Sequence, residues 1–293
     1  MLLATSLVLA SACLHALWNV LLKRARDLHA ASLGILALSV LITWAMVPWT
    51  RGPLIPGRAA LAWTLGAGIG EGCYFVLLAC ALEAAPLGWS YAWMRGVGML
   101  LVWPVSVLLL GEPLRTLAAL SVGVVCLGLA LLGRAPARGQ GSRSFLWAAA
   151  AGVAIAGFTL CYKAALVHGA HPVMLYATAM LVALPIQTGI RIRRLGWRAG
   201  LVLPETWRAV PPRSCQPGLV LCAGILCAAS FLLYLEALDL AGAGAMATLR
   251  NTSIVFAVLL SRAFGVLAER PTCRQWAGAA LVTAGAVGLA WGR

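Results

Sequence analysis

Ten long apolar runs divide the sequence, and this pattern constrains the fold more than any other feature. The runs cover residues 3–22, 31–49, 61–82, 87–110, 117–132, 145–166, 172–190, 217–238, 243–264 and 275–291. A helix needs about 20 apolar residues to cross the hydrocarbon core of a bilayer. A spanning segment is helical because lipid offers its backbone no hydrogen bonds. We therefore predict an all-α integral membrane protein with ten transmembrane helices.

The composition excludes several other classes of protein. Hydrophobic residues make up 62% of the chain and charged residues 10%, against about 45–50% and about 25% in soluble domains. The sequence contains no GxSxG, HExxH or GxxxxGK[ST] motif and no Cys/His cluster with metal-ligand spacing. We therefore expect neither an enzyme nor an ATP-driven pump, and no cofactor or bound metal.

The two halves of the chain resemble each other. The stretch ALEAAPLGWSYAWMRG from Ala81 resembles ALDLAGAGAMATLRN from Ala237, and a one-residue gap aligns Arg95 with Arg250. Near the starts of the halves, WNVLLK ending at residue 23 resembles FTLCYK ending at residue 163. Because each half has five spans, an odd number, the second half enters the membrane the other way round.

This inverted repeat predicts the domain organisation. We place the first five-helix repeat at residues 1–134, a linker at 135–144 and the second repeat at 145–293. Secondary transporters commonly have this plan, with the binding site near the midplane between the repeats.

The charged residues predict an orientation. The loops after the odd-numbered runs, together with Arg262 at the end of the ninth run, carry 15 of the 22 Lys and Arg residues. The opposite side, with both termini and Lys163, carries five. The positive-inside rule then places those loops in the cytoplasm and both termini outside. This basic excess indicates anionic membrane lipids rather than nucleic acid as the partner.

Three stretches resemble the drug/metabolite transporter superfamily, in its ten-helix EamA-type branch. They are His15-Ala16-Leu17-Trp18-Asn19, then Tyr74 to Gly111 with Glu112-Pro113-Leu114, and the second copy from Phe231 to Arg293 with Glu269-Arg270. The resemblance implies a central cavity between two five-helix halves and export or exchange of metabolites across a bacterial inner (cytoplasmic) membrane. Members of this family often have both termini in the cytoplasm, opposite to the charge count, so the orientation stays open.

Two arginines lie near the middle of apolar runs. Arg95 and Arg250 are repeat-related, and together they could grip a carboxylate or phosphate group of a substrate with paired hydrogen bonds. Alternatively, each could bond a nearby carboxylate or carbonyl and lock helices together. Asn251 follows Arg250 and could bind the solute or satisfy the arginine.

Glu71 and His15 are the candidates for proton coupling. Glu71 lies at the centre of its run, where a carboxyl beside an arginine could take up and release a proton; a permanent ion pair with Arg95 is the alternative. His15 could relay protons near neutral pH or simply form a hydrogen bond that packs helices.

Aromatic and amide side chains complete the expected substrate site. Tyr74 shares a helix face with Glu71, and Tyr91 shares one with Arg95. Trp93, paired with Trp89, could form an aromatic wall for the solute or pack against lipid. Trp18 and Asn19 are added from the motif in the first span.

These observations predict a secondary-active transporter, an exporter of amino-acid-like or other anionic metabolites that works by alternating access. Its partners would be a small-molecule substrate, protons or an exchanged solute, and membrane lipids. Two alternatives remain, a proton-coupled exporter of hydrophobic cationic drugs and a flippase for a phosphorylated lipid carrier.

Overall fold

All regular secondary structure in the part of the chain that the structure describes is helical. The computed structural model describes residues 2–50, 57–85, 87–111, 116–133, 142–196, 216–263 and 273–291. Seven of its helices are long and apolar enough to cross a membrane. Its helices are α1 (Leu2–Lys23), α2 (Leu28–Met46), α3 (Arg58–Ala84), α4 (Leu87–Leu110), α5 (Thr116–Gly133), α6 (Ser142–Val167), α7 (Pro172–Leu195), α9 (Gln216–Leu240), α10 (Ala243–Arg250), α11 (Ser253–Ala263) and α12 (Cys273–Trp291), with a short 3₁₀ turn η1 (Val47–Trp49) after α2.

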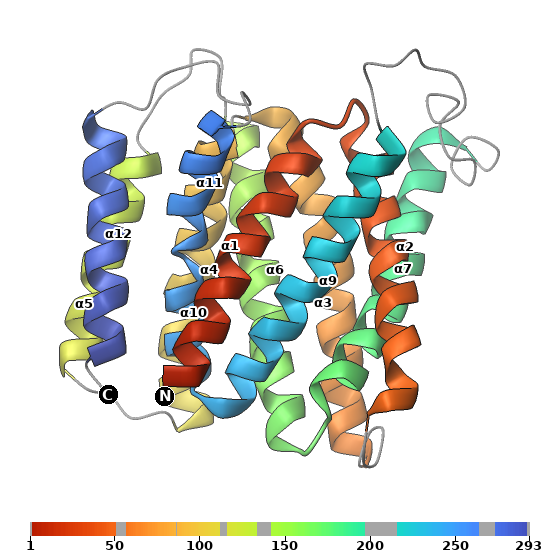
Figure 1. Ribbon diagram of the computed structural model, residues 1–293, viewed down its shortest axis with the longest axis horizontal. Helices are drawn as coiled ribbons and strands as arrows, with labels where there is room; N and C mark the ends of the chain where they lie inside the picture. Colours follow the sequence, from red (N-terminus) through yellow and green to blue (C-terminus); the bar gives the residue numbers. More distant parts are fainter. Residues whose placement is uncertain are drawn as a thin grey trace.

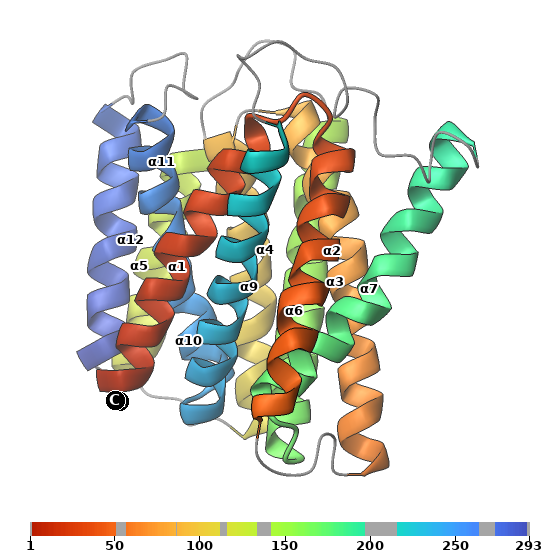
Figure 2. The same cartoon turned by 45° about the vertical axis from the view of Figure 1, so that its right-hand side comes forward.

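The helices stand side by side in one bundle (Figures 1 and 2). We call the end at which both termini lie the lower end, and the opposite end, where α1 finishes and α2 begins, the upper end (Figure 1). Three pairs of helices pack closely: α1 against α9, α3 against α6, and α5 against α12. The α5–α12 pair lies at one edge of the bundle, and α2 and α7 lie toward the other (Figure 1). The bundle core is therefore built from α1, α3, α4, α6, α9 and α10.

The distribution of side chains is that of a protein surrounded by lipid. Large apolar side chains such as Leu100, Leu108 and Leu120 are exposed on the outside of the bundle, whereas Glu71 and Arg250 are buried inside it. A charged side chain inside a membrane protein is costly, and such residues usually face the bundle interior. The core of the bundle is thus the place to look for a functional site.

Four glycines bring α3 close to two neighbouring helices. A Cβ atom on Gly66 or Gly70 would meet α6, and one on Gly68 or Gly72 would meet α7. At Gly68 it would lie 2.6 Å from the Cβ of Val182 and 2.7 Å from the carbonyl oxygen of Ala179. Small residues at helix interfaces allow backbones to approach in this way. The interleaved GxxxG pairs therefore wedge α3, with Glu71 between them, against α6 and α7.

The predicted span at 243–264 is not one helix, which corrects the interpretation from the sequence. It is broken between α10 and α11 at Asn251 and Thr252. The Asn251 N–H donates to Thr248 O at 3.0 Å and the Thr252 N–H to Leu249 O at 3.1 Å, which is the spacing of a 3₁₀ turn. The Thr252 hydroxyl also donates to Leu249 O at 2.8 Å, a side-chain bond of the type that bends helices.

The other apolar runs coincide with single helices to within a few residues. The predicted linker at 135–144 ends inside a helix, because α6 begins at Ser142. The rest of the linker, and the motif residues Glu112–Leu114 and Glu269–Arg270, lie outside the described residues.

We expect Gly68→Ala to destabilise the protein, because its methyl group would overlap α7. Overpacking of this kind costs about 1–3 kcal/mol, which would appear as a lower midpoint of thermal unfolding in detergent. Gly157→Ala is the matched control, since a Cβ on this exposed helical glycine would meet nothing within 4 Å. Equal midpoints for the two variants would show that α3 and α7 are not in such close contact.

Candidate functional site

His15 lies at the centre of a buried polar cluster formed by α1, α9 and α10. Its Nδ1 atom is 3.2 Å from Trp18 Nε1, 3.1 Å from Arg250 Nη2 and 3.4 Å from the hydroxyl oxygen of Ser230. The indole and guanidinium nitrogens can only donate hydrogen bonds. His15 Nδ1 is therefore the acceptor, so the ring is neutral and its proton is on Nε2.

Arg250, the last residue of α10, is held by polar and aromatic contacts. Besides His15, its Nη2 lies 3.4 Å from the Ser230 hydroxyl. Its guanidinium carbon lies 4.5 Å from the ring centroid of Phe231 and 3.9 Å from that of Tyr234, both on α9. A cation over an aromatic face is stabilised by the ring quadrupole, more strongly when it is desolvated. α9 thus contacts the guanidinium of Arg250 through one hydroxyl and two aromatic rings.

Arg95 reaches the same cluster through Tyr91. Its guanidinium carbon lies 5.6 Å from the Tyr91 ring centroid, and the Tyr91 hydroxyl donates to the His15 carbonyl oxygen at 3.4 Å. Asn19 donates to the same carbonyl at 2.8 Å. The structure therefore brings together His15, Trp18, Asn19, Tyr91, Arg95 and Arg250.

Glu71 lies on the other side of an aromatic layer. Its Oε1 accepts a hydrogen bond from the Tyr162 hydroxyl at 3.1 Å. The Tyr162 ring contacts Phe158, which in turn contacts Phe231 beneath Arg250. This chain of rings connects the carboxylate on α3 to the arginine on α10.

A permanent ion pair between Glu71 and Arg95 is not present among the residues that the structure describes. There the ion pairs join His29 to Glu83 at 3.4 Å and Asp27 to Arg191 at 3.5 Å. Glu71 is fully buried and its Oε2 atom has no hydrogen-bond partner in that same part of the chain. The carboxylate therefore keeps one oxygen open to a proton or a solute.

Of two aromatic residues predicted in the substrate site, Tyr74 lies beside the central cluster and Trp93 does not. Tyr74 is buried against Phe75 and Phe158, next to the Glu71 side of the cluster. Trp93 is only partly buried and packs on Trp89 and Phe145, so it does not join the central residues.

Buried polar atoms around the cluster lack partners among the described residues. A buried unsatisfied group costs about 1–3 kcal/mol, so these atoms make the cluster a candidate functional site. Both hydrogen-bond donors and acceptors are present among them. The atoms are His15 Nε2, Asn19 Oδ1, Glu71 Oε2, Arg250 Nε, Asn251 Nδ2 and Ser253 Oγ.

Sequence reasoning missed four residues of the site. Ser230, Phe231 and Tyr234 seat Arg250, and Tyr162 holds Glu71. Phe231 and Tyr162 lie in stretches already quoted for the family resemblance and the internal repeat. The signal for Tyr162 was its position next to Lys163 in the second copy of the repeated WNVLLK motif.

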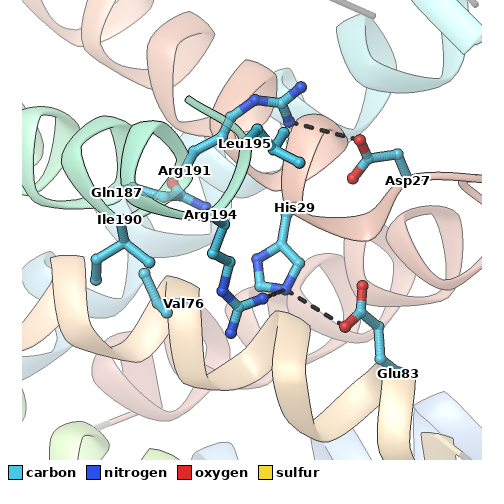
Figure 3. A pocket seen from close by; sticks show the side chains of 9 residues that line it. All are labelled: Asp27, His29, Val76, Glu83, Gln187, Ile190, Arg191, Arg194 and Leu195. Carbon is cyan, nitrogen blue, oxygen red and sulfur yellow. Dashed lines mark hydrogen bonds and ion pairs between the residues drawn. The ribbon is translucent and has the colours of Figure 1, made fainter. Parts of the chain in front are cut away.

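A second polar cluster, which we call the end cluster, lies at the upper end between α2, α3 and α7. It consists of Asp27, His29, Glu83, Arg191 and Arg194, around a cavity of about 210 Å³ (Figure 3). Arg194 Nη1 lies 2.8 Å from His29 Nε2, the same atom that faces Glu83. The Asp27 carboxylate also caps the first turn of α2 through the Ala30 N–H at 2.9 Å. These contacts tie the three helices together at this end.

A bundle of apolar helices with charged groups buried at its centre is the arrangement expected of a membrane transporter. Comparison with known sequences supports this class. A profile of the EamA-like transporter family matches residues 142–291, just over half of the chain, and one of the Small Multidrug Resistance protein matches residues 54–125. The protein belongs to the EamA-like transporter family, which confirms the resemblance found in the sequence.

The fold has a counterpart among solved structures. A chain in a crystal structure, titled only as a protein, superposes with a TM-score of 0.72 over 97% of this chain and 95% of its own, at 19% sequence identity. At this level of identity the likeness shows the fold alone. No curated protein sequence matches the chain.

Proposed function

We propose that the protein is a secondary-active exporter of small organic metabolites that carry an anionic group, with amino-acid-like solutes as the best candidates. The observation that carries this proposal is that two repeat-related arginines lie about the buried His15: Arg250 contacts its ring, and Arg95 lies near Tyr91, which donates to its carbonyl. Two guanidinium groups suit a carboxylate or phosphate. Glu71 Oε2 and Asn19 Oδ1 are acceptors for an ammonium group.

We further propose that the chain forms ten spans as two inverted five-helix repeats. The packing supports this, because it recurs under the exchange of halves: α1 packs on α9 as α6 packs on α3, and α2 packs on α9 as α7 packs on α3. The broken helix α10–α11 takes the place of α4. Alternating access would then come from rocking about the central cluster.

The rival functions use the same residues differently. A cation exporter would use Glu71 as its binding site, and the unpartnered Oε2 favours such a role. Arg95 and Arg250 oppose it, because two fixed positive charges repel a cation. A flippase would bind a lipid phosphate at the two arginines. Transport of a water-soluble substrate would therefore favour the exporter over the flippase.

For orientation, we propose that the upper end faces the cytoplasm of a bacterial inner membrane. The support is the excess of Lys and Arg in the loops at that end. Arg193 lies there and is exposed. In a background without native cysteines, Arg193→Cys should resist an impermeant thiol reagent added outside intact cells. Rapid labelling of this cysteine would show that the upper end faces the outside of the cell.

We expect Arg95→Lys to weaken substrate binding strongly, because lysine keeps the charge but loses the two-pronged geometry. The substrate is first identified by counterflow into proteoliposomes from amino acids, phosphonates, sugars and cations. Loss of a charge-assisted contact worth about 1.5–3 kcal/mol lowers affinity roughly 10- to 150-fold, measured by thermal-shift titration.

Arg250→Lys should lower both affinity and ligand-free stability, because it also breaks the contacts with His15 and Ser230. Arg95→Lys should leave ligand-free stability nearly unchanged. Parent-like affinity in both variants would show that the arginines do not bind the substrate. Counterflow of cations alone would favour the cation exporter.

We expect Glu71→Gln to abolish transport driven by a pH gradient while exchange of substrate continues. Glutamine retains an oxygen that can accept from Tyr162 but cannot take up the proton. Counterflow and pH-driven uptake are measured in the same proteoliposomes. Normal uptake with an unchanged pH dependence would make Glu71 a bystander, and failure of the variant to fold would make it structural.

A further inference from the structure

The chain has only two lysines, Lys23 and Lys163, beside 20 arginines. The two lysines end the repeated segments WNVLLK and FTLCYK, so they occupy equivalent places in the two halves. Every other fixed cation of the chain is an arginine. Lysine is thus confined to these two repeat-related positions.

Each lysine binds the end of a helix in the same register. The Lys23 ammonium donates to the carbonyl oxygens of Leu82 and Ala85, the latter at 3.2 Å, at the end of α3. The Lys163 ammonium donates to the carbonyl oxygens of Leu238 at 2.7 Å and Ala241 at 3.0 Å, at the end of α9.

In both cases the acceptors are the residue two before the last residue of the helix and the residue one after it. The next helix then begins two residues later, α4 at Leu87 and α10 at Ala243. We call these contacts the upper clasp (Lys23, Leu82, Ala85) and the lower clasp (Lys163, Leu238, Ala241).

The chemistry of the clasps explains the choice of lysine. The last carbonyls of a helix have no partner within the helix and carry the negative end of its dipole. An ammonium group is compact and has three donors that can converge on two carbonyls one turn apart. A guanidinium is a flat, wide fork suited to carboxylates and phosphates.

The clasps join helices that pack elsewhere. α1 packs along α9, and α3 packs along α6, whereas the backbones of α1 and α3 approach much less closely, as do those of α6 and α9. The upper clasp crosses from α1 to α3, and the lower clasp crosses from α6 to α9. They therefore connect the same two helix pairs at opposite ends of the bundle, since α1 finishes at the upper end and α9 at the lower (Figure 1).

The candidate site lies between these two helix pairs. His15 and Ser230 belong to the α1–α9 pair, and Glu71 and Tyr162 belong to the α3–α6 pair. Separating the pairs at one end would open the site at that end and would break the clasp there. The other clasp would remain as the point about which the pairs tilt.

We propose that Lys23 and Lys163 are the two gate residues of the transporter, each holding one end of the site closed and releasing it in turn. The inference rests on the proposed alternating-access function and adds to it the residues that control which end opens. Lys23 acts at the upper end and Lys163 at the lower end.

The test measures access to the site from each side of the membrane. A single reporter, Ser230→Cys, is placed in a variant whose nine native cysteines are replaced. Membrane vesicles of both orientations are treated with an impermeant sulfonate-bearing methanethiosulfonate. Lys23→Met should speed labelling from the upper side only, and Lys163→Met from the lower side only. Loss of a charge-assisted hydrogen bond should change each rate roughly 10- to 150-fold.

Arg24→Met is the matched control, because Arg24 is the exposed neighbour of Lys23 and its loss also removes one positive charge. Its labelling rates should equal those of the parent. If a Lys→Met protein does not reach the membrane, Lys→Arg replaces it. Arginine keeps the charge but not the convergent geometry, so a smaller increase is expected from the same side.

Unchanged rates in both lysine variants, or faster labelling from the same side in both, would overturn the proposal. The labelling needs no substrate, so it is independent of the counterflow assay. If counterflow is lost but each lysine variant still labels faster from its own side, the proposed solute is wrong and the two gate residues stand. If counterflow is normal but neither variant labels faster from its own side, the proposed solute stands and the gate residues are wrong.

Discussion

Holding a guanidinium in the middle of an apolar bundle is the constraint on which the rest of this structure depends. Arg250 is 1% exposed, and lipid can neither solvate it nor provide acceptors. Its neighbours answer this requirement with an imidazole nitrogen, a hydroxyl and two aromatic faces, supplied by α1 and α9. The close packing of α1 on α9 is thus also the packing that solvates the arginine. The Arg250 Nε–H has no hydrogen-bond partner among the described residues.

The sequence predicted the helices well because the bilayer fixes both their length and their composition. It also predicted the central residues, since a charge within an apolar run is too costly to be accidental. The internal repeat then paired Arg95 with Arg250 across 155 positions. The contact of His15 with Arg250 was not predicted, because the sequence marked His15 only as a proton relay or a helix-packing residue.

Other features depend on information that a sequence pattern lacks. The direction in which a side chain leaves its helix depends on which neighbours surround that helix, so Trp93 was expected in the site and instead packs toward α6. Nothing in the sequence marks Tyr162 as the partner of Glu71, because its hydrogen bond to Glu71 depends on the packing of α6 against α3. The break at Asn251 and Thr252 has no Gly or Pro to mark it, and arises from local hydrogen bonds that compete with a continuous helix.

That break makes the two repeat-related segments around Arg95 and Arg250 unequal. In α4 the arginine lies inside an uninterrupted helix, whereas in the second half it lies where one helix stops and another starts. A homodimer of a single half would carry the break in both copies or in neither. Joining the halves in one polypeptide lets each copy mutate independently. Under the proposed function, this inequality would let a molecule with an acid at one end and an amine at the other be held in a single direction.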